Sequence, residues 1–451
     1  MPVTAGDLAE VLTAAAAEHH VPGAAAGVVV GDETITAAHG VAHTAFPGPV
    51  TTATLFQVGS VSKTITSAAV MLLVQEGRLS LADPVARHLP DLGPATGLDT
   101  EAITVEMVLS HQAGFDGDHL FVERSTDLAD LAGARRLFAP GQGFSYSNAG
   151  FSIAGAVVEA AGGTEFDRFV RDRLFRPLGM RSACFTADEA LTWPVAAPHW
   201  VFDGTAHVLR HAGWQPGWEM QPADRPAAGV VASLDDLLAW ARFQWTGADR
   251  DGNELLSRAS LDRLHTPVRR VDLLDEVALD WDVEDIDGAT AIGHGGVTVG
   301  YITDLLVVPA ERFAFVGLTN ATNGAAVNQA VRRWALEQGA GLVEHDPEPD
   351  PTLATIDRAR FEGRYLHPFA ILDVTAGDEP GTLVLTASER DVDGWQPPVD
   401  DPITYALFAP DHAVSLDAPG PVRHISFGLD DTGDGPAGWV LVGGRRASRL
   451  G

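Results

Sequence analysis

The sequence predicts an α+β protein in two parts, a large one that mixes helices with strand hairpins and a small one built from strands. The chain has 451 residues, more than one hydrophobic core usually absorbs. Helical and strand-like apolar patterns mix over residues 1–345, prolines and acids fill 346–351, and short alternating runs follow over 352–451. We therefore expect a domain of 1–345, a linker at 346–351 and a second domain of 352–451.

The first part is expected to open with a helix and a hairpin. Apolar residues recur at helical spacing behind Thr4, a suitable N-cap, and the helix should end near His20. Residues 24–30 and 34–39 are short runs of strand character separated by turn residues. This order predicts a helix followed by two antiparallel strands.

A buried helix is expected from Ser60 to Glu76. Its residues are apolar on nearly every side, and Gly77 supplies a stop. The start of this helix would therefore lie deep inside the protein. Further helices are predicted over 153–161, 234–243 and 325–338, and two strands joined at a turn over 294–320.

The residues after 351 show a different periodicity. Short alternating runs separated by turn residues predict strands, which are expected over 371–375, 382–386, 403–408, 422–427 and 439–442. Strands of this length and spacing are typical of a small antiparallel barrel or sandwich.

Composition excludes several classes of partner. A formal charge of −31 would repel a phosphate backbone or an anionic membrane, so neither nucleic acid nor membrane is expected. The single cysteine, Cys184, allows no internal disulfide. No segment approaches the roughly 18 apolar residues of a membrane helix, and no basic and apolar leader opens the chain. We expect a cytoplasmic protein, and without His-Glu-x-x-His or a cysteine pair we expect no metal and no other cofactor.

Chemistry is predicted first at Ser60 and Lys63, three residues apart at the start of the buried helix. Both side chains project from one face about one turn apart, so the hydroxyl and the amine can touch. Burial and the positive end of the helix dipole disfavour the charged amine and make a neutral base available. Lys63 is the only lysine of the chain, and arginine could not replace it because it does not deprotonate. Ser60 is the predicted nucleophile, and its unpaired backbone N–H a predicted oxyanion donor.

Two further segments carry candidate residues. Tyr146, one of four tyrosines, follows a turn-rich loop and could relay the serine proton, its phenol acidified by a nearby ammonium, while Asn148 binds a substrate amide. His294 stands before paired glycines and could bind or polarise the acyl group, although a histidine among glycines is more often a turn residue. His111 is interpreted as structural.

In their order along the chain, these motifs resemble the penicillin-binding-protein and class C β-lactamase superfamily of serine hydrolases. Ser60-Val61-Ser62-Lys63 is similar to its Ser-x-x-Lys motif, Tyr146-Ser147-Asn148 to its Tyr-x-Asn motif, and His294-Gly295-Gly296 to the His-x-Gly that stands in for Lys-Thr-Gly. The resemblance covers residues 5 to about 340. It implies a five-stranded antiparallel sheet flanked by helices, with a helical subdomain inserted and the site between them.

The resemblance also implies roles. Ser60 would attack a carbonyl while Lys63 and Tyr146 take its proton, and the resulting serine ester would pass its acyl group to an acceptor that decides the reaction. His294 would help to hold the acyl donor. The backbone N–H groups of Ser60 and Val297 would form the oxyanion hole. The residues expected at the substrate besides His294 are Asn148, Gly295, Gly296 and Val297.

The residues after the linker resemble the lipocalin-like domain appended to several of these enzymes, including the stand-alone penicillin-binding-protein-type thioesterases. Those enzymes close nonribosomal peptides head to tail, taking a D-configured C-terminal residue from a carrier-protein thioester and passing it to the peptide's own amine. A cytoplasmic enzyme cannot reach cell-wall peptide, which favours such a cyclase acting on a peptidyl thioester or ester.

Two alternatives to the cyclase stay open. One is a hydrolase with water as the acceptor, which would cleave an ester, a D-amino-acid amide or a β-lactam. The other is a binding protein that senses acyl ligands, and an intact serine, lysine, tyrosine and histidine argue against it because a binder needs no lysine base.

Four residues carry open alternatives. Arg445 or Arg446 could bind a carboxylate at the cleft, or both could lie in a solvated end of the chain. Trp214 and Trp218 could line a substrate pocket or pack in the core. No heptad or apolar stripe indicates an oligomeric state.

Overall fold

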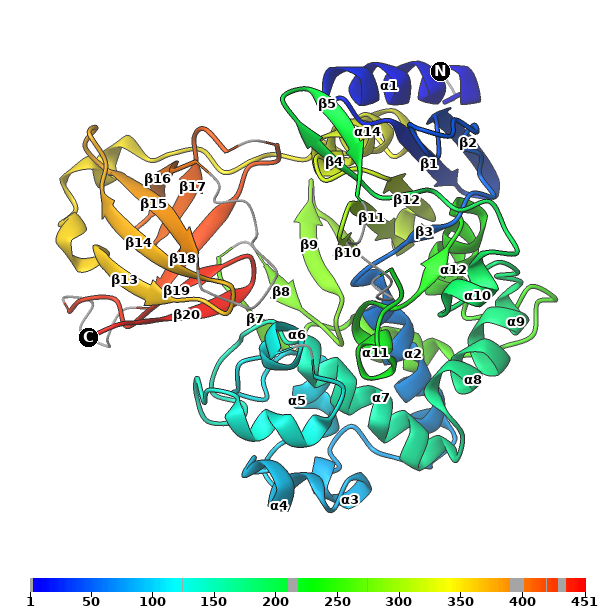
Figure 1. Cartoon of the computed structure of the whole chain (residues 1–451), viewed down its shortest axis with the longest axis horizontal. Helices are drawn as coiled ribbons and strands as arrows, with labels where there is room; N and C mark the ends of the chain where they lie inside the picture. Colours follow the sequence, from blue (N-terminus) through cyan, green and yellow to red (C-terminus); the bar gives the residue numbers. More distant parts are fainter. Residues whose placement is uncertain are drawn as a thin grey trace.

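The computed structural model describes residues 3–123, 125–209, 218–273, 275–389, 401–418, 420–428 and 435–451. Figure 1 shows a unit of helices around a sheet and, beside it, a barrel drawn in yellow to red. The predicted α+β class is confirmed. Within these ranges, no helix is both long enough and apolar enough to cross a membrane.

The main sheet is antiparallel and has the strand order β2-β1-β12-β11-β10-β9-β8-β7. The prediction of five strands is therefore wrong. Three more strands, β9, β8 and β7, extend the sheet beyond β10. The first half of β10 would otherwise be an unpaired edge, and β9 pairs with it on the side away from β11. The strands are β1 (Gly23–Val30), β2 (Glu33–Gly40), β7 (Arg269–Arg270), β8 (Glu276–Val277), β9 (Asp282–Ile286), β10 (Ala289–Thr298), β11 (Tyr301–Val308) and β12 (Phe313–Thr319).

The segment predicted as two strands over 294–320 contains three. Thr298 of β10 pairs with Tyr301 of β11, so the strands are joined by a two-residue turn. Gly300 adopts a φ of +84° there, a conformation that glycine reaches without strain. The sequence prediction missed this turn because the residues around it are apolar and a single glycine marks it.

Helices cover both faces of the sheet. β1 is buried on both faces, with Ala25 and Val29 in one core and Ala24 in the other. α1 (Ala5–Glu18) and α14 (Gly324–Gly339) pack on the second face, and α12 (Leu234–Thr246) packs on the first. Thr4 and Ser233 begin α1 and α12 with capping boxes, which explains why the sequence located these helix starts well.

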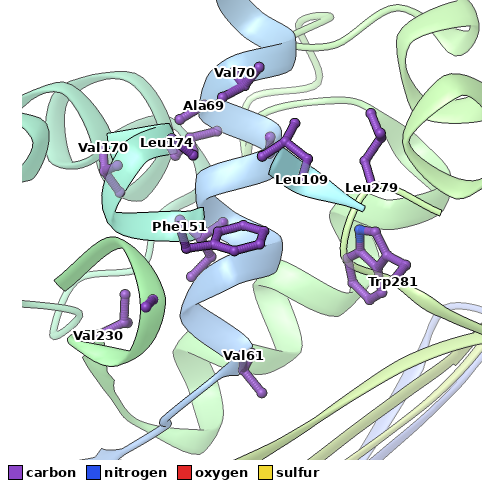
Figure 2. Close-up of a cluster of buried hydrophobic side chains, with 14 of the residues drawn as sticks. Val61, Ala69, Val70, Leu109, Phe151, Val170, Leu174, Val230, Leu279 and Trp281 are labelled. Carbon is purple, nitrogen blue, oxygen red and sulfur yellow. The ribbon is translucent and has the colours of Figure 1, made fainter. Parts of the chain in front are cut away.

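α2 (Val61–Gln75) runs through the middle of the larger core. Its residues from Val61 to Leu73 are buried without interruption. Figure 2 shows the helix within the cluster, with Val230 on one side and Leu279 and Trp281 on the other. α7 (Asn148–Gly162) and α11 (Arg225–Ala228) pack directly against α2. The start of α2 is therefore held by neighbours that come from distant parts of the chain.

The remaining elements of the first unit are short. The helices among them are α3 (Val85–His88), α4 (Leu92–Thr96), α5 (Val105–Leu109), α6 (His119–Glu123), η1 (Leu128–Gly133), α8 (Phe166–Val170), η2 (Arg171–Phe175), α9 (Arg176–Leu178), α10 (Ala187–Ala190), η3 (Pro222–Asp224), α13 (Arg258–His265) and η4 (Pro309–Glu311). Two small sheets pair β3 (Phe56–Gln57) with β6 (Val231–Ala232), and β4 (His199–Phe202) with β5 (Thr205–Val208).

The C-terminal strands close into an eight-stranded antiparallel barrel, one of the two predicted architectures. Two short helical turns, η5 (Pro351–Thr355) and η6 (Arg358–Arg360), precede it. The expected boundaries at 346–351 stay a prediction. The barrel strands are β13 (Gly363–Leu366), β14 (Ala370–Ala376), β15 (Thr382–Glu389), β16 (Ile403–Ala409), β17 (His412–Ser415), β18 (His424–Gly428), β19 (Trp439–Val442) and β20 (Arg445–Arg449).

Candidate active site

Ser60 lies at the start of α2, and its hydroxyl does not cap the helix. It is the N-cap residue, yet its side chain makes no capping hydrogen bond. Its Oγ lies 2.9 Å from the Nζ of Lys63, one turn further along the helix. The Ser60 N–H donates to no acceptor within the part of the chain that the structure describes. A hydroxyl beside an amine and a free N–H are what a serine nucleophile requires.

Lys63 is fully buried beneath this hydroxyl. Its Nζ also lies 2.9 Å from the carbonyl oxygen of Ala227 in α11 and 4.7 Å from the centre of the Tyr146 ring. Burial lowers the pKa of Lys63 to about 7 and outweighs the opposing charge of Asp280. The neutral amine expected from the sequence is therefore well populated near neutral pH.

Tyr146 stands against the Ser60–Lys63 pair, one residue before Ser147, the N-cap of α7. The ring of His111 lies 4.4 Å from its own ring, centre to centre. Burial, together with the charge of Asp280, raises the pKa of Tyr146 well above its usual value. A hydrogen bond with Ser60 acts to lower this pKa but is outweighed. The expectation of an acidified phenol is wrong, because the loss of solvent outweighs the nearby positive charge. The phenol keeps its proton and is a donor.

His294, in β10, is buried and paired with a carboxylate. Its Nε2 lies 3.4 Å from Asp280, whose other oxygen lies 2.9 Å from the Nε2 of His111. Burial acts to lower the pKa of His294, but the charge and hydrogen bond of Asp280 outweigh it and raise the pKa. His111 in turn accepts a hydrogen bond from the Ser147 N–H at 3.0 Å. His111 and Asp280 therefore connect His294 to the loop that carries Tyr146.

The residues before Ser60 pack closely on β10. A Cβ built on Gly59 would lie 2.7 Å from the Val297 nitrogen, and one built on Gly296 would lie 2.0 Å from the Val58 carbonyl oxygen. Gly295, by contrast, faces open space. The contact brings the backbone of Val297 beside that of Ser60, as a two-donor oxyanion hole requires.

A turn of the barrel completes the site. The Tyr146 N–H donates to the Gly444 carbonyl at 2.8 Å, and the Arg445 guanidinium lies 4.9 Å from the Tyr146 ring centre. Arg445 Nε donates to Asp118 at 2.6 Å, and Asn148 Nδ2 donates to the other Asp118 oxygen at 2.5 Å. Of the two alternatives for Arg445, it therefore lies beside Tyr146, already paired with a carboxylate.

The other residues with open alternatives fall elsewhere. The Arg446 guanidinium lies over the rings of Trp439 and Phe138, at 4.5 and 5.4 Å from their centres. Trp218 is half-buried beside a small buried cluster and donates from Nε1 to the Tyr301 hydroxyl at 2.9 Å. Its role at the substrate stays a prediction. Trp214 lies outside the described residues.

Comparison with known proteins decides the family. A family model described as beta-lactamase matches residues 8–340. The chain belongs to the β-lactamase family. It is a serine hydrolase of the superfamily that β-lactamases share with penicillin-binding proteins. Penicillin-binding protein 4 of Amycolatopsis lactamdurans is 33% identical over 367 residues, which are 77% of this chain and 94% of that protein.

Two other similarities bear on this β-lactamase-family protein. The unguisins hydrolase ungD' of Aspergillus campestris is 27% identical over 340 residues, which are 70% of this chain and 61% of that protein. The crystal structure of SurE is 26% identical and covers 99% of both chains with a TM-score of 0.74. A second structure, of SurE with D-Leu, has the same identity and coverage and a TM-score of 0.72. The similarity to SurE therefore includes the barrel.

Three acidic residues of this β-lactamase-family site were not singled out from the sequence. Asp118 and Asp280 are fully or almost fully buried against the arginine and histidines described above. Asp224 is the last residue of η3. Burial raises its pKa to about 6, although the charge of Lys63 acts to lower it. The one sequence signal available was Gly117, where a Cβ would meet the Ser147 Cα at 2.2 Å, so the chain at Asp118 must approach the Tyr146 loop closely.

Proposed function

We propose that the protein forms an acyl-enzyme on Ser60. The observation that carries this proposal is the 2.9 Å contact between Ser60 Oγ and Lys63 Nζ, an amine whose pKa is lowered by burial to about 7. Neutral Lys63 takes the hydroxyl proton as Oγ attacks the substrate carbonyl carbon. The N–H groups of Ser60 and Val297 stabilise the oxyanion. The protonated Tyr146 phenol passes a proton to the leaving group and recovers one from the Lys63 ammonium. His294 and Asn148 hold the acyl donor.

The proposed reaction is the release and head-to-tail macrolactamisation of a nonribosomal peptide with a D-configured C-terminal residue. The peptide arrives as a thioester or ester, presented by a carrier protein in the cytoplasm. Its own amine attacks the acyl-Ser60 carbonyl and gives a proton to neutral Lys63, the amide bond forms, and the Ser60 oxygen leaves and recovers that proton from the Lys63 ammonium. Similarity to SurE over the whole chain, with one SurE structure holding D-Leu, supports this substrate class.

A hydrolase is the second candidate, and the similarity to the unguisins hydrolase favours it. The same acyl-Ser60 would then be attacked by water instead of an amine, and the peptide acid or another acid would be released. Esters, D-amino-acid amides and β-lactams are the substrates to compare. The groups described around Ser60 serve both reactions, so the acceptor must be determined by experiment.

The deciding experiment uses linear peptide thioester mimics that end in a D or an L residue, with intact masses of products and protein. We expect the D-ended mimic to give a product lighter by one water than its hydrolysed acid, and the L-ended mimic to give little. Ser60→Ala should abolish the product. Linear acid alone, or faster turnover of simple esters than of any peptide, would identify a hydrolase and refute the cyclase.

A further inference from the structure

The barrel turn at Gly443 and Gly444 is bonded to the backbone around Tyr146. The Gly444 carbonyl accepts from the Tyr146 N–H at 2.8 Å, and the Arg446 N–H donates to the Ser145 hydroxyl at 3.2 Å. Gly444 has a φ of +74°, and a Cβ built on it would lie 3.4 Å from the Tyr146 Cβ. The turn and the start of the strand that follows it therefore contact the loop that places the phenol.

Asp118 joins this turn to Asn148. Its side chain has no exposed surface, and both of its oxygens are used. Arg445 donates from Nε at 2.6 Å and from Nη2 at 3.4 Å, while Asn148 donates from Nδ2 at 2.5 Å. A buried carboxylate is costly unless it is paired, and the arginine brought by the barrel is the charged partner of Asp118 beside Asn148. Two parts of the chain 327 positions apart thus build one side of the site.

We propose that Asp118 is a positioning residue, and that the Asp118–Arg445 pair is the means by which the barrel orients Asn148 and Tyr146 and sets the electrostatic environment of Lys63. The barrel is then a working part of the active site. This inference rests on the acyl-Ser60 function and deepens it, because it assigns the C-terminal unit a role in the same chemistry.

The two charges of the pair act on the pKa of Lys63 in opposite directions. The Arg445 charge lowers the pKa of Lys63 and the Asp118 charge raises it, in an environment dominated by burial. Removal of one partner should therefore move the lysine titration in the direction set by the partner that remains. The titratable or charged groups that act on Lys63 or pack against it are Ser60, His111, Asp118, Tyr146, Asp224, Asp280, His294 and Arg445.

Lys63 can be observed directly because it is the only lysine. Full-length protein labelled with lysine enriched in carbon-13 at Cε gives one lysine side-chain signal, whose chemical shift against pH reports the Lys63 pKa. We expect a midpoint near 7 in the wild type, a lower one in Asp118→Asn and a higher one in Arg445→Gln. Opposite shifts are a signature that a merely structural role would not produce.

Asp116→Asn is the matched control for Asp118→Asn. Asp116 is also buried, accepts from Arg135 at 3.0 Å, and Arg135 donates to the Leu366 carbonyl of the barrel. Its Oδ1 accepts from the Asp118 N–H at 3.3 Å, and it has no side-chain bond to Asn148. With 4-nitrophenyl acetate as substrate, we expect kcat/KM to fall about 100-fold in Asp118→Asn, as a misplaced catalytic group predicts, and to stay within about threefold of wild type in Asp116→Asn, whose asparagine oxygen can still accept a hydrogen bond.

Two results would overturn the proposal. One is a lysine midpoint that stays at the wild-type value in both Asp118→Asn and Arg445→Gln. The other is an equal loss of kcat/KM in the Asp116 and Asp118 variants. Failure of the acyl-Ser60 function is a separate outcome, and it is tested by treating the wild type with a fluorophosphonate, which reacts with nucleophilic serines. If that function fails, mass spectrometry would find no fluorophosphonate adduct at Ser60, whatever the lysine titration shows.

Discussion

Lys63 is the residue on which the proposed chemistry depends most directly. Lys63→Arg keeps the positive charge but removes the base, because a guanidinium does not deprotonate. We expect kcat/KM to fall by roughly 10²–10⁴-fold, the usual contribution of a general base. In the wild type, the rate should fall as pH drops through about 7, where the amine becomes protonated. The measurement is 4-nitrophenyl acetate hydrolysis from pH 5 to 9, with circular dichroism to establish that the variant is folded.

Activity of Lys63→Arg within tenfold of wild type would show that another group is the base. Asp224 is the residue to replace next in that case, because burial raises its pKa to about 6 and its charge acts on Lys63.

At the scale of single residues, local spacing decided what the sequence could predict. Ser60 and Lys63 were predictable because one helical turn fixes their distance. Asp280 was not, because it meets His111 across 169 positions of the chain. The error over the Tyr146 phenol has a related cause. Its pKa depends on burial by distant segments, which no local pattern reports.

The close contact between the start of α2 and β10 is the element-scale feature on which the proposed oxyanion hole depends. Gly296→Ala would place a Cβ 2.0 Å from the Val58 carbonyl oxygen, a backbone atom that cannot turn aside. Overpacking of this kind costs about 1–3 kcal/mol, so we expect a lower Tm and loss of activity. Gly295→Ala is the matched control, since nothing lies within 4 Å of its new Cβ and its Tm should match wild type. Equal Tm values for the two variants, measured by thermal unfolding, would contradict this account.

Elements with strong end signals were predicted best. Ser233 and Asp236 form the capping box at the start of α12, and the sequence alone shows it. The two-residue strands β7 and β8 have no periodicity of their own, because pairing with their neighbours alone makes them strands. The sequence therefore predicted the long helices but not the edge of the sheet that β8 and β7 form.

At the scale of the whole molecule, the side on which the barrel docks could not be predicted. The sequence gives two separate patterns, and the contacts that join them connect residues far apart in the chain, such as Tyr146 with Gly444 and Asp272 with His424. Figure 1 shows β7 and β8 on the side of the first unit that faces the barrel. The turn between these strands carries the second of the two contacts.

His424 of β18 should make barrel docking depend on pH. Its Nε2 lies 3.0 Å from Asp272 and 3.0 Å from Asp275. Burial acts to lower the pKa of His424, but its hydrogen bonds to the two carboxylates prevail and raise it from 6.5 to about 10. Because the folded-state pKa is the higher one, the stabilisation is complete below about pH 6.5 and is lost as pH rises toward 10.

We therefore expect the Tm of the full chain to fall between pH 6.5 and 10, and His424→Gln to remove part of that fall while lowering the Tm at pH 6. His345→Gln is the control, since His345 also faces an aspartate, at 3.7 Å, but is largely exposed. The buffers should contain EDTA, because two aspartates and a histidine can also bind a divalent cation. A His424→Gln protein with the wild-type pH dependence of Tm would show that the carboxylates of Asp272 and Asp275 do not hold the barrel through this imidazole.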